Sequence, residues 1–223
     1  MGLPSGTERE ISEIEASSKA RGYTVSRLTG AAASEQNFKA MSGKQSPDYI
    51  HLATHGFFFP NPSAVNEGPQ AEFPATTGSI IRNSENPLLR SGVLLAGGNR
   101  AWQSEKKNES SEDGILTSYE ISNLYFPNTK LVVLSACGTA LGDIRQSEGV
   151  YGLQRAFKIA GVSALVMSLW KVPDEETAQF MQLFCNELFA LHNVADAFAA
   201  TQQAMKKKYK DNFYKWAAWI LVL

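Results

Sequence analysis

The chain has 223 residues, 43% of them hydrophobic and 19% charged, and this length and composition fit one globular domain, residues 1–223, with a core of its own. A formal net charge of −1 gives no sign that the protein contacts nucleic acid directly or binds an anionic membrane surface. With two cysteines, no signal peptide and no apolar run of the ~18 residues that a membrane span needs, we expect a cytoplasmic protein without membrane contact.

The N-terminal quarter of the chain predicts two helices and two strands. Thr7 and Glu10 have the spacing of a capping box, so a helix is expected to begin there and to end near Gly22. Ser34 is expected to begin a second helix. The helices are thus predicted at 7–22 and 34–41, and the strands at 23–28 (YTVSRL) and 49–55 (YIHLATH), the last ending at Gly56.

Two polar segments interrupt the regular pattern. Residues 57–92 contain prolines at positions 60, 62, 69, 74 and 87 and predict no regular element. A loop this long in a compact domain is usually functional or disordered, and segments rich in Lys, Glu and Ser stay solvated. We therefore interpret residues 60–86 and 99–112 as mobile insertions that cover a cleft, dock a partner or regulate activity.

Strands and helices alternate in the rest of the chain. Each strand is apolar along its length, which is typical of a mainly parallel sheet covered on both faces, in an α/β fold. Asp174 is expected to cap one of the helices. Strands are predicted at 91–97, 129–139, 162–170 and 214–223, and helices at 115–126, 147–161, 174–192 and 194–209.

His55 and Cys137 lie at the ends of two predicted strands, and each is followed by a glycine. In parallel sheets, functional groups gather at the carboxyl ends of the strands. A cysteine nucleophile needs a base within hydrogen-bond reach and N–H donors for the oxyanion that it creates. Both residues also have a structural interpretation, as a satisfied core histidine and a small hydrophobe, and spacing alone does not decide between the two.

His51 and Cys185 have structural interpretations. His51 and His55 are four residues apart and are predicted to share one strand face, but a zinc site needs a third ligand and none appears at short spacing. We therefore expect no metal and no cofactor. His51 is interpreted as a structural residue beneath the site, Cys185 as a core residue of a helix, and Phe57–Phe59 as the start of a loop that walls the cleft.

Several blocks of sequence together resemble the CHAT domain family over essentially the whole chain. These blocks are "HLATHGFF", "NPLLRSGVLLAG", "DGILTSYEIS", "LVVLSACGT", "SEGVYGLQRAFKIAGVSALVMSLWKVPDEET" and "WAAWILVL". CHAT domains are caspase-like (clan CD) cysteine peptidase domains, related to separases and usually attached to tetratricopeptide repeats. The resemblance implies a caspase-like three-layer sandwich, with a mainly parallel central sheet of about six strands flanked by helices.

The resemblance also implies roles for individual residues. His55, in "ATHG", matches the general base or acid of a Cys–His dyad, and Cys137, in "SACG", matches the nucleophile. The backbone N–H groups of Gly56 and Cys137 would form the oxyanion hole. Gly138 stands where many family members have glutamate, a difference that should not disable the dyad.

Substrate specificity is predicted from "SLWKVPDEE", which resembles the separase segment that places an aspartate in the S1 pocket. By position, Asp174 is that aspartate, with Ser135 and Trp170 as pocket walls. An arginine or lysine at P1 would follow from charge complementarity. The alternative is that Asp174 only caps its helix, and the two roles compete for the same carboxylate.

The predicted function is a cysteine endopeptidase that cleaves a protein substrate after a basic residue. Family resemblance implies activation by an adjoining or partner sensor, of tetratricopeptide or another type, in signalling, defence or cell-death pathways. One alternative is a catalytically silent caspase-like interaction module. Another is a Cys–His hydrolase or acyltransferase acting on small amides, which the family blocks do not favour.

Overall fold

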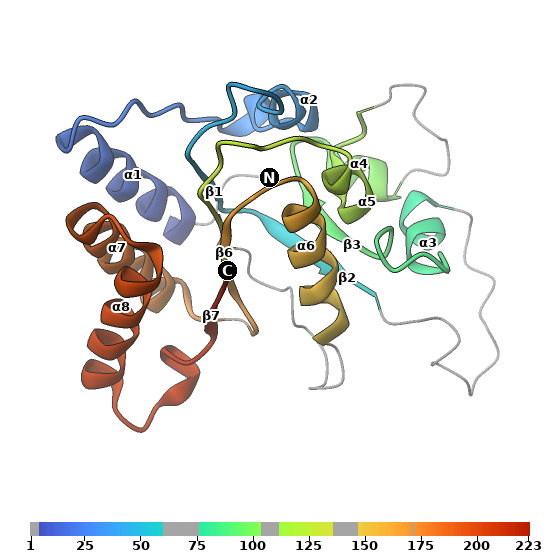
Figure 1. Ribbon diagram of the computed structural model, residues 1–223. Helices are drawn as coiled ribbons and strands as arrows, with labels where there is room; N and C mark the ends of the chain where they lie inside the picture. Colours follow the sequence, from blue (N-terminus) through green and yellow to red (C-terminus); the bar gives the residue numbers. More distant parts are fainter. Residues whose placement is uncertain (1–4, 60–75, 104–111, 136–146, 171) are drawn as a thin grey trace.

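The computed structural model describes residues 5–59, 76–103, 112–135, 147–170 and 172–223. Within these residues the strands form two separate sheets (Figure 1). Sheet A has the order β1-β5-β6-β7; its first three strands are parallel and β7 is antiparallel to β6. The strands of sheet A are β1 (Tyr49–Leu52), β5 (Leu131–Leu134), β6 (Ala164–Ser168) and β7 (Trp219–Val222).

Helices cover both faces of sheet A. One face packs against three helices, which Figure 1 shows together on the left: α1 (Ser5–Ala20), α7 (Asp174–Leu191) and α8 (Val194–Tyr209). The other face packs against α2 (Glu35–Lys39), α5 (Ser118–Ser122) and α6 (Ser147–Ile159). Two short 3-10 helices, Gly30–Ala32 and Phe213–Lys215, lie in connections. The three-layer arrangement follows from strands that are apolar on both faces.

Strand β5 shows why these runs are continuously apolar. Val132 and Leu134 enter the core beneath α6, whereas Leu131 and Val133 enter the core beneath α7 and α8. All four side chains are buried. Successive side chains of a strand point to opposite faces, so a strand covered on both faces needs an apolar residue at every position.

Sheet B is a smaller antiparallel sheet in the order β2-β3-β4. Its β3 and β4 contribute Val93 and Leu116 to the core beneath α6. On its other side, Phe57 packs edge to face on Trp102, with ring centroids 5.1 Å apart. The elements are β2 (His55–Phe58), β3 (Ser91–Leu94) and β4 (Ile115–Thr117), with α3 (Thr77–Arg82) and α4 (Gly98–Gln103) beside them.

The sequence prediction of a mixed α/β fold with a mainly parallel, helix-flanked sheet is confirmed. A single central sheet of about six strands is not confirmed, because the described strands divide into four in sheet A and three in sheet B. The predicted strand 49–55 is in fact two strands. Strand β1 ends at Leu52, and β2 begins at His55 in the other sheet, so the prediction that Phe57–Phe59 start a loop is wrong for Phe57 and Phe58.

Several local predictions were wrong for identifiable reasons. Helix α1 begins at Ser5, so Thr7 lies inside the helix and does not cap it. Residues 23–28 form no strand; Tyr23 instead packs its ring against Tyr49 and Phe189, with centroids 6.0 and 4.7 Å away. The proline-rich region was expected to hold no regular element, yet it contains α3, capped by Thr76.

The predicted insertions 60–86 and 99–112 overlap α3 and α4 at their described ends, and their remaining parts, 60–75 and 104–111, lie outside the described residues. Among the helices of the described ranges, none combines the length and apolarity needed to cross a membrane.

Candidate functional site

The candidate site lies at the carboxyl edge of sheet A. Strands β1 and β5 run parallel and in register there, with Leu52 opposite Leu134. The next residue of the chain, Ser135, donates its backbone N–H to the carbonyl of Leu52 over 2.9 Å. Parallel strands that end together leave their following loops at one edge, and this is the place where α/β proteins bind ligands.

His55 lies just past the end of β1, three residues after Leu52, as the first residue of β2. The chain turns from one sheet into the other at Ala53 and Thr54, and the Thr54 hydroxyl donates a hydrogen bond to the Leu94 carbonyl of β3. The His55 side chain is exposed, and Gly56 follows it within the strand, opposite Val93. His55 is therefore held by an antiparallel strand at the edge of the parallel sheet.

Cys137 follows Leu134 by three positions in the sequence but lies outside the described residues, as does Gly138. The dyad geometry and the oxyanion hole formed by Gly56 and Cys137 therefore stay predictions.

His51 has a different environment from His55. Its Nε2 lies 2.7 Å from Oε1 of Glu10, a residue of α1 that is only 4% exposed. The two histidines belong to different strands and different sheets, so the prediction that they share one strand face is wrong. The contact between Glu10 and His51 joins α1 to β1, which fits the structural role expected for His51.

The three predicted S1 residues lie in different surroundings. Ser135 is buried, and its hydroxyl has no hydrogen-bond partner within the described part of the chain. Trp170 follows β6, donates its indole N–H to the Tyr214 carbonyl over 3.0 Å and packs edge to face on the Tyr214 ring. Asp174 is exposed at the first position of α7.

Asp174 lines an open groove of about 570 Å³ between α1, α7 and α8. The N-cap of α7 is Pro173, and no side chain caps this helix, so the prediction that Asp174 is the N-cap is wrong. A Cβ placed on Gly6 of α1 would lie 2.6 Å from the Asp174 Cβ, so the first turn of α1 passes directly over this aspartate. Ser135 and Trp170 are not among the described residues that line the groove.

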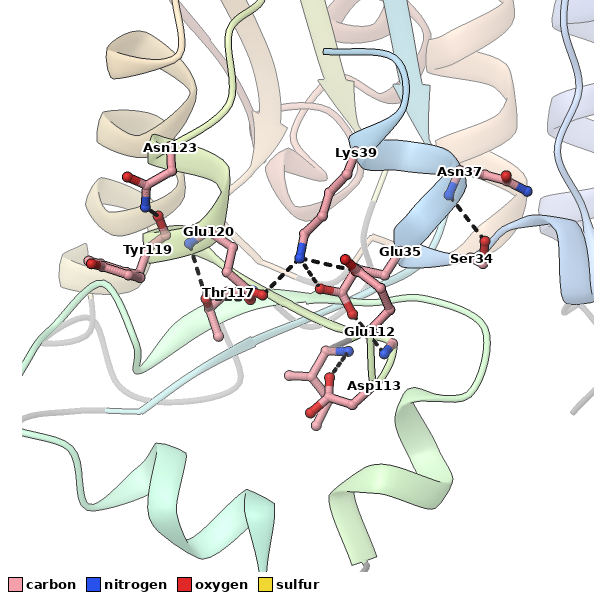
Figure 2. A network of polar contacts seen from close by, with 12 residues as sticks. Ser34, Glu35, Asn37, Lys39, Glu112, Asp113, Thr117, Tyr119, Glu120 and Asn123 are labelled. Carbon is pink, nitrogen blue, oxygen red and sulfur yellow. Dashed lines mark hydrogen bonds and ion pairs between the residues drawn. The ribbon is translucent and has the colours of Figure 1, made fainter. Parts of the chain in front are cut away.

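A cluster of one lysine and three glutamates lies between α2, α5 and the segment that precedes β4 (Figure 2). The Lys39 ammonium lies 2.6 Å from the Glu35 carboxylate and 3.0 Å from those of Glu112 and Glu120. Glu120 also accepts hydrogen bonds from the backbone N–H and the hydroxyl of Thr117, at 2.9 and 2.7 Å. We call Lys39, Glu35, Glu112 and Glu120 the Lys39 cluster.

Burial and charge set the ionisation of this cluster. Glu35 is 1% exposed, and burial raises the pKa of its carboxyl to about 7 despite the ion pair with Lys39 and the hydrogen bond from Gly114. Burial works against the charge of Lys39, but the surrounding carboxylates outweigh it and raise the pKa of the ammonium. Burial also opposes the charge of Glu120, but the hydrogen bonds from Thr117 and Lys39 lower its pKa on balance.

Comparison with known proteins gives the family. The sequence matches the CHAT domain family over residues 3–222, nearly the whole chain. The chain belongs to the CHAT domain family. Over 112 residues, 48% of the chain, it is 31% identical to tetratricopeptide repeat protein 28 of Homo sapiens. The Mus musculus protein of the same name is 30% identical over the same length, and the aligned part covers 4% of either relative.

The second cysteine of this CHAT domain is a core residue, as predicted. Cys185 is 8% exposed on α7, and burial raises the pKa of its thiol to about 12. A thiol with this pKa holds almost no thiolate near neutral pH and is a poor nucleophile. Within the described ranges, no group of three or more His, Cys, Asp or Glu side chains is arranged to hold a metal ion.

Sequence reasoning missed the Lys39 cluster in this CHAT domain. A signal was present, since Glu35 and Lys39 have the i, i+4 spacing of a helical ion pair. That spacing does not reveal burial, and the partner Glu120 is 81 positions away. The cluster became visible only when the fold brought these segments together.

Proposed function

We propose that this CHAT domain is a cysteine endopeptidase in which Cys137 is the nucleophile and His55 the general acid and base. The observation that carries the proposal is the register of β1 and β5: Leu52 pairs with Leu134, and the two proposed residues each follow by three positions. Three residues of chain span at most about 11 Å, and this reach is compatible with a Cys137 thiol that meets His55 at the edge where His55 lies exposed.

The proposed chemistry follows from these two groups. The Cys137 thiolate attacks a substrate carbonyl carbon and forms a tetrahedral oxyanion, for which backbone N–H groups of Gly56 and Cys137 would be the donors. Collapse of the oxyanion breaks the C–N bond and leaves a thioester, while the His55 imidazolium protonates the departing amine. His55 then takes a proton from water, and hydroxide releases the acid product and regenerates the thiolate.

For specificity, we propose a basic P1 residue that is recognised by Asp174. No capping role occupies its carboxylate, and the groove that it lines also contains the acidic Glu13 and Glu175. Of the two cations along the groove, Arg9 is paired with Glu13 at 2.8 Å. An arginine or lysine side chain would therefore enter a groove with an excess of negative charge. Ser135 and Trp170 do not line this groove within the described residues; they follow β5 and β6, and we propose them as walls of the S1 pocket where it meets the strand ends.

The partners proposed are a protein substrate and a regulatory domain of the tetratricopeptide or another sensor type. Support comes from the names of the two relatives, which refer to tetratricopeptide repeats. We place the enzyme in the cytoplasm, in signalling, defence or cell-death pathways in which CHAT domains act.

The test compares the wild type with Cys137→Ala and His55→Ala on a positional library of fluorogenic peptides, with and without candidate activators. Cys185→Ala is the matched control, because its buried thiol should contribute neither turnover nor labelling. We expect turnover after Arg or Lys in the wild type and the control, none in the other two variants, and labelling of Cys137 by an electrophilic peptide. If peptide turnover by the wild type never exceeds the rate in buffer and Cys137 stays unlabelled, the peptidase proposal fails. If the probe labels Cys137 but no peptide is cleaved, the catalytically silent interaction module takes its place.

A further inference from the structure

A continuous set of contacts leads from the Lys39 cluster into sheet B. The Glu35 carboxylate accepts a hydrogen bond from the backbone N–H of Gly114 over 2.8 Å. The Gly114 carbonyl in turn accepts from the backbone N–H of Leu95 over 2.7 Å. Gly114 immediately precedes β4 and Leu95 immediately follows β3, so Glu35 holds the two strands at the end where they are connected.

A second contact fixes the same end of the antiparallel pair β3–β4, which we call the hairpin, to the segment before α2. The Ala96 N–H donates to the Ala33 carbonyl over 2.8 Å. The backbone here is tightly packed, since Gly114 has a φ of 84° and a Cβ at this position would lie 2.5 Å from the Ala96 oxygen and the Gly98 nitrogen. Only glycine fits this backbone without strain, so a small displacement of the connection is not easily absorbed there.

The contacts continue from β3 to His55. Leu94 is paired with Ile115 of β4 on one side and with His55 of β2 on the other. Its carbonyl also accepts the hydrogen bond from the Thr54 hydroxyl, at the turn that leads into β2. Any shift of the hairpin relative to α2 therefore moves the residue beside His55.

Within the described residues, little else fixes the position of His55. Its side chain is exposed, and no hydrogen bond to its imidazole is found among the described residues. Among the described residues, the position of the imidazole therefore depends on the backbone of β2. A nearly fully buried carboxylate such as Glu35 is costly to keep, and an apolar residue would hold α2 against the hairpin without that cost.

We propose that Glu35 and Lys39 are positioning residues for His55, acting through Gly114 and Leu94. This inference rests on the proposed role of His55 as acid and base. Lys39 holds the Glu35 carboxylate in place beside Glu112 and Glu120, Glu35 holds the connected end of β3 and β4, and these strands set the start of β2.

The experiment uses the full chain, with Glu35→Ala as the perturbation and Glu35→Gln as the conservative variant that keeps an oxygen for the Gly114 N–H. Glu176→Ala is the matched control: Glu176 is 5% exposed and paired with Lys215 at 2.5 Å, but in α7, away from the hairpin. The first readout is the NMR signal of the His55 imidazole at fixed pH, assigned with His55→Gln among three histidines. The second readout is the separation of kcat from KM on the best peptide.

We expect Glu35→Ala to shift and broaden the His55 signal and to lower kcat about 10- to 100-fold with KM within about twofold, because misplacing a catalytic group chiefly affects the chemical step. Glu35→Gln should restore the signal and most of kcat, and Glu176→Ala should leave the signal unchanged. If Glu35→Ala does not fold, Glu112→Ala, with a partly exposed side chain, should shift the signal in the same direction to a smaller extent.

The proposal is overturned if Glu35→Ala folds and leaves the His55 signal unchanged, or if Glu176→Ala changes that signal as much as Glu35→Ala does. If Glu35→Ala does not fold, an unchanged His55 signal in Glu112→Ala overturns the proposal. The NMR readout needs no substrate. A chain that proves inactive as a peptidase would therefore refute the proposed function, while the signal would still decide whether Glu35 positions His55.

Discussion

Replacing Glu35 with glutamine should change how the stability of the fold depends on pH. The folded protein raises the pKa of this carboxyl from its ordinary 4.5 to about 7. Between these two values the folded state binds a proton that the unfolded chain has released. Stability contributed by this group is therefore present at low pH and is lost as pH rises toward 7.

The size of the effect follows from the shift. Each unit of pKa difference corresponds to about 1.4 kcal/mol, so between pH 5 and pH 8 the wild type should lose about 2–3 kcal/mol of unfolding free energy through Glu35 alone. Glutamine has no charge to bury and can still accept the Gly114 hydrogen bond. The variant should therefore gain about 2–3 kcal/mol relative to the wild type over the same pH interval.

Urea unfolding, followed by tryptophan fluorescence at pH 5 and pH 8, measures this difference. Titration of other groups is common to both proteins and cancels to first order. Glu15→Gln is the matched control, since Glu15 also pairs with a lysine four residues later, at 2.7 Å, but its ion pairs lower its pKa. The unfolding free energy of Glu15→Gln, relative to that of the wild type, should not rise between pH 5 and pH 8. An equal stability difference for Glu35→Gln at both pH values would refute the reasoning.

Three further predictions follow from side chains described above. Asp174→Ala should abolish the preference for Arg or Lys at P1 while the thermal unfolding curve stays near that of the wild type; unchanged P1 selectivity would remove Asp174 from S1. Phe180→Ala should cost about 3–5 kcal/mol in urea unfolding, because the fully buried ring stacks on Trp219 with centroids 4.7 Å apart, and a loss below about 1 kcal/mol would contradict this packing. Gly92→Ala should lower the melting temperature by several degrees, since the added methyl would overlap the Leu116 carbonyl and the Phe57 ring, and no change in melting temperature would show that sheet B adapts.

The elements predicted correctly from sequence are those whose signals are local. Strands β5 and β6 are apolar runs, and α6 ends at Ile159, two residues before Gly161, whose φ of 98° fits the helix stop that the sequence indicated. The division between β1 and β2 was missed, because the hydrogen bond that marks it joins Thr54 to a residue 40 positions away. An apolar run does not show which of two sheets its end will join.

For the candidate site, the sequence indicated that His55 lies near the end of a buried strand, and His55 does follow the end of β1 by three residues. The prediction that His55 itself ends that strand was wrong, because His55 begins β2 and Gly56 lies inside β2. It did not reveal the position of Asp174 beneath the first turn of α1, which depends on the packing of two helices far apart in the chain. The burial of Glu35 was missed for the same reason. Residues that act through tertiary contacts carry no local pattern to find.

The division of the strands into two sheets has a mechanical consequence. Within one sheet, hydrogen-bond register fixes the spacing of neighbouring residues, but His55 and Leu134 belong to different sheets, so packing determines the distance between them. Helix α6 lies against both sheets, and its Gly152 packs so closely on β3 that an added Cβ would have to displace the Ser91 hydroxyl. A tilt of this one helix would change the distance between His55 and the end of β5 while every strand kept its own pairing.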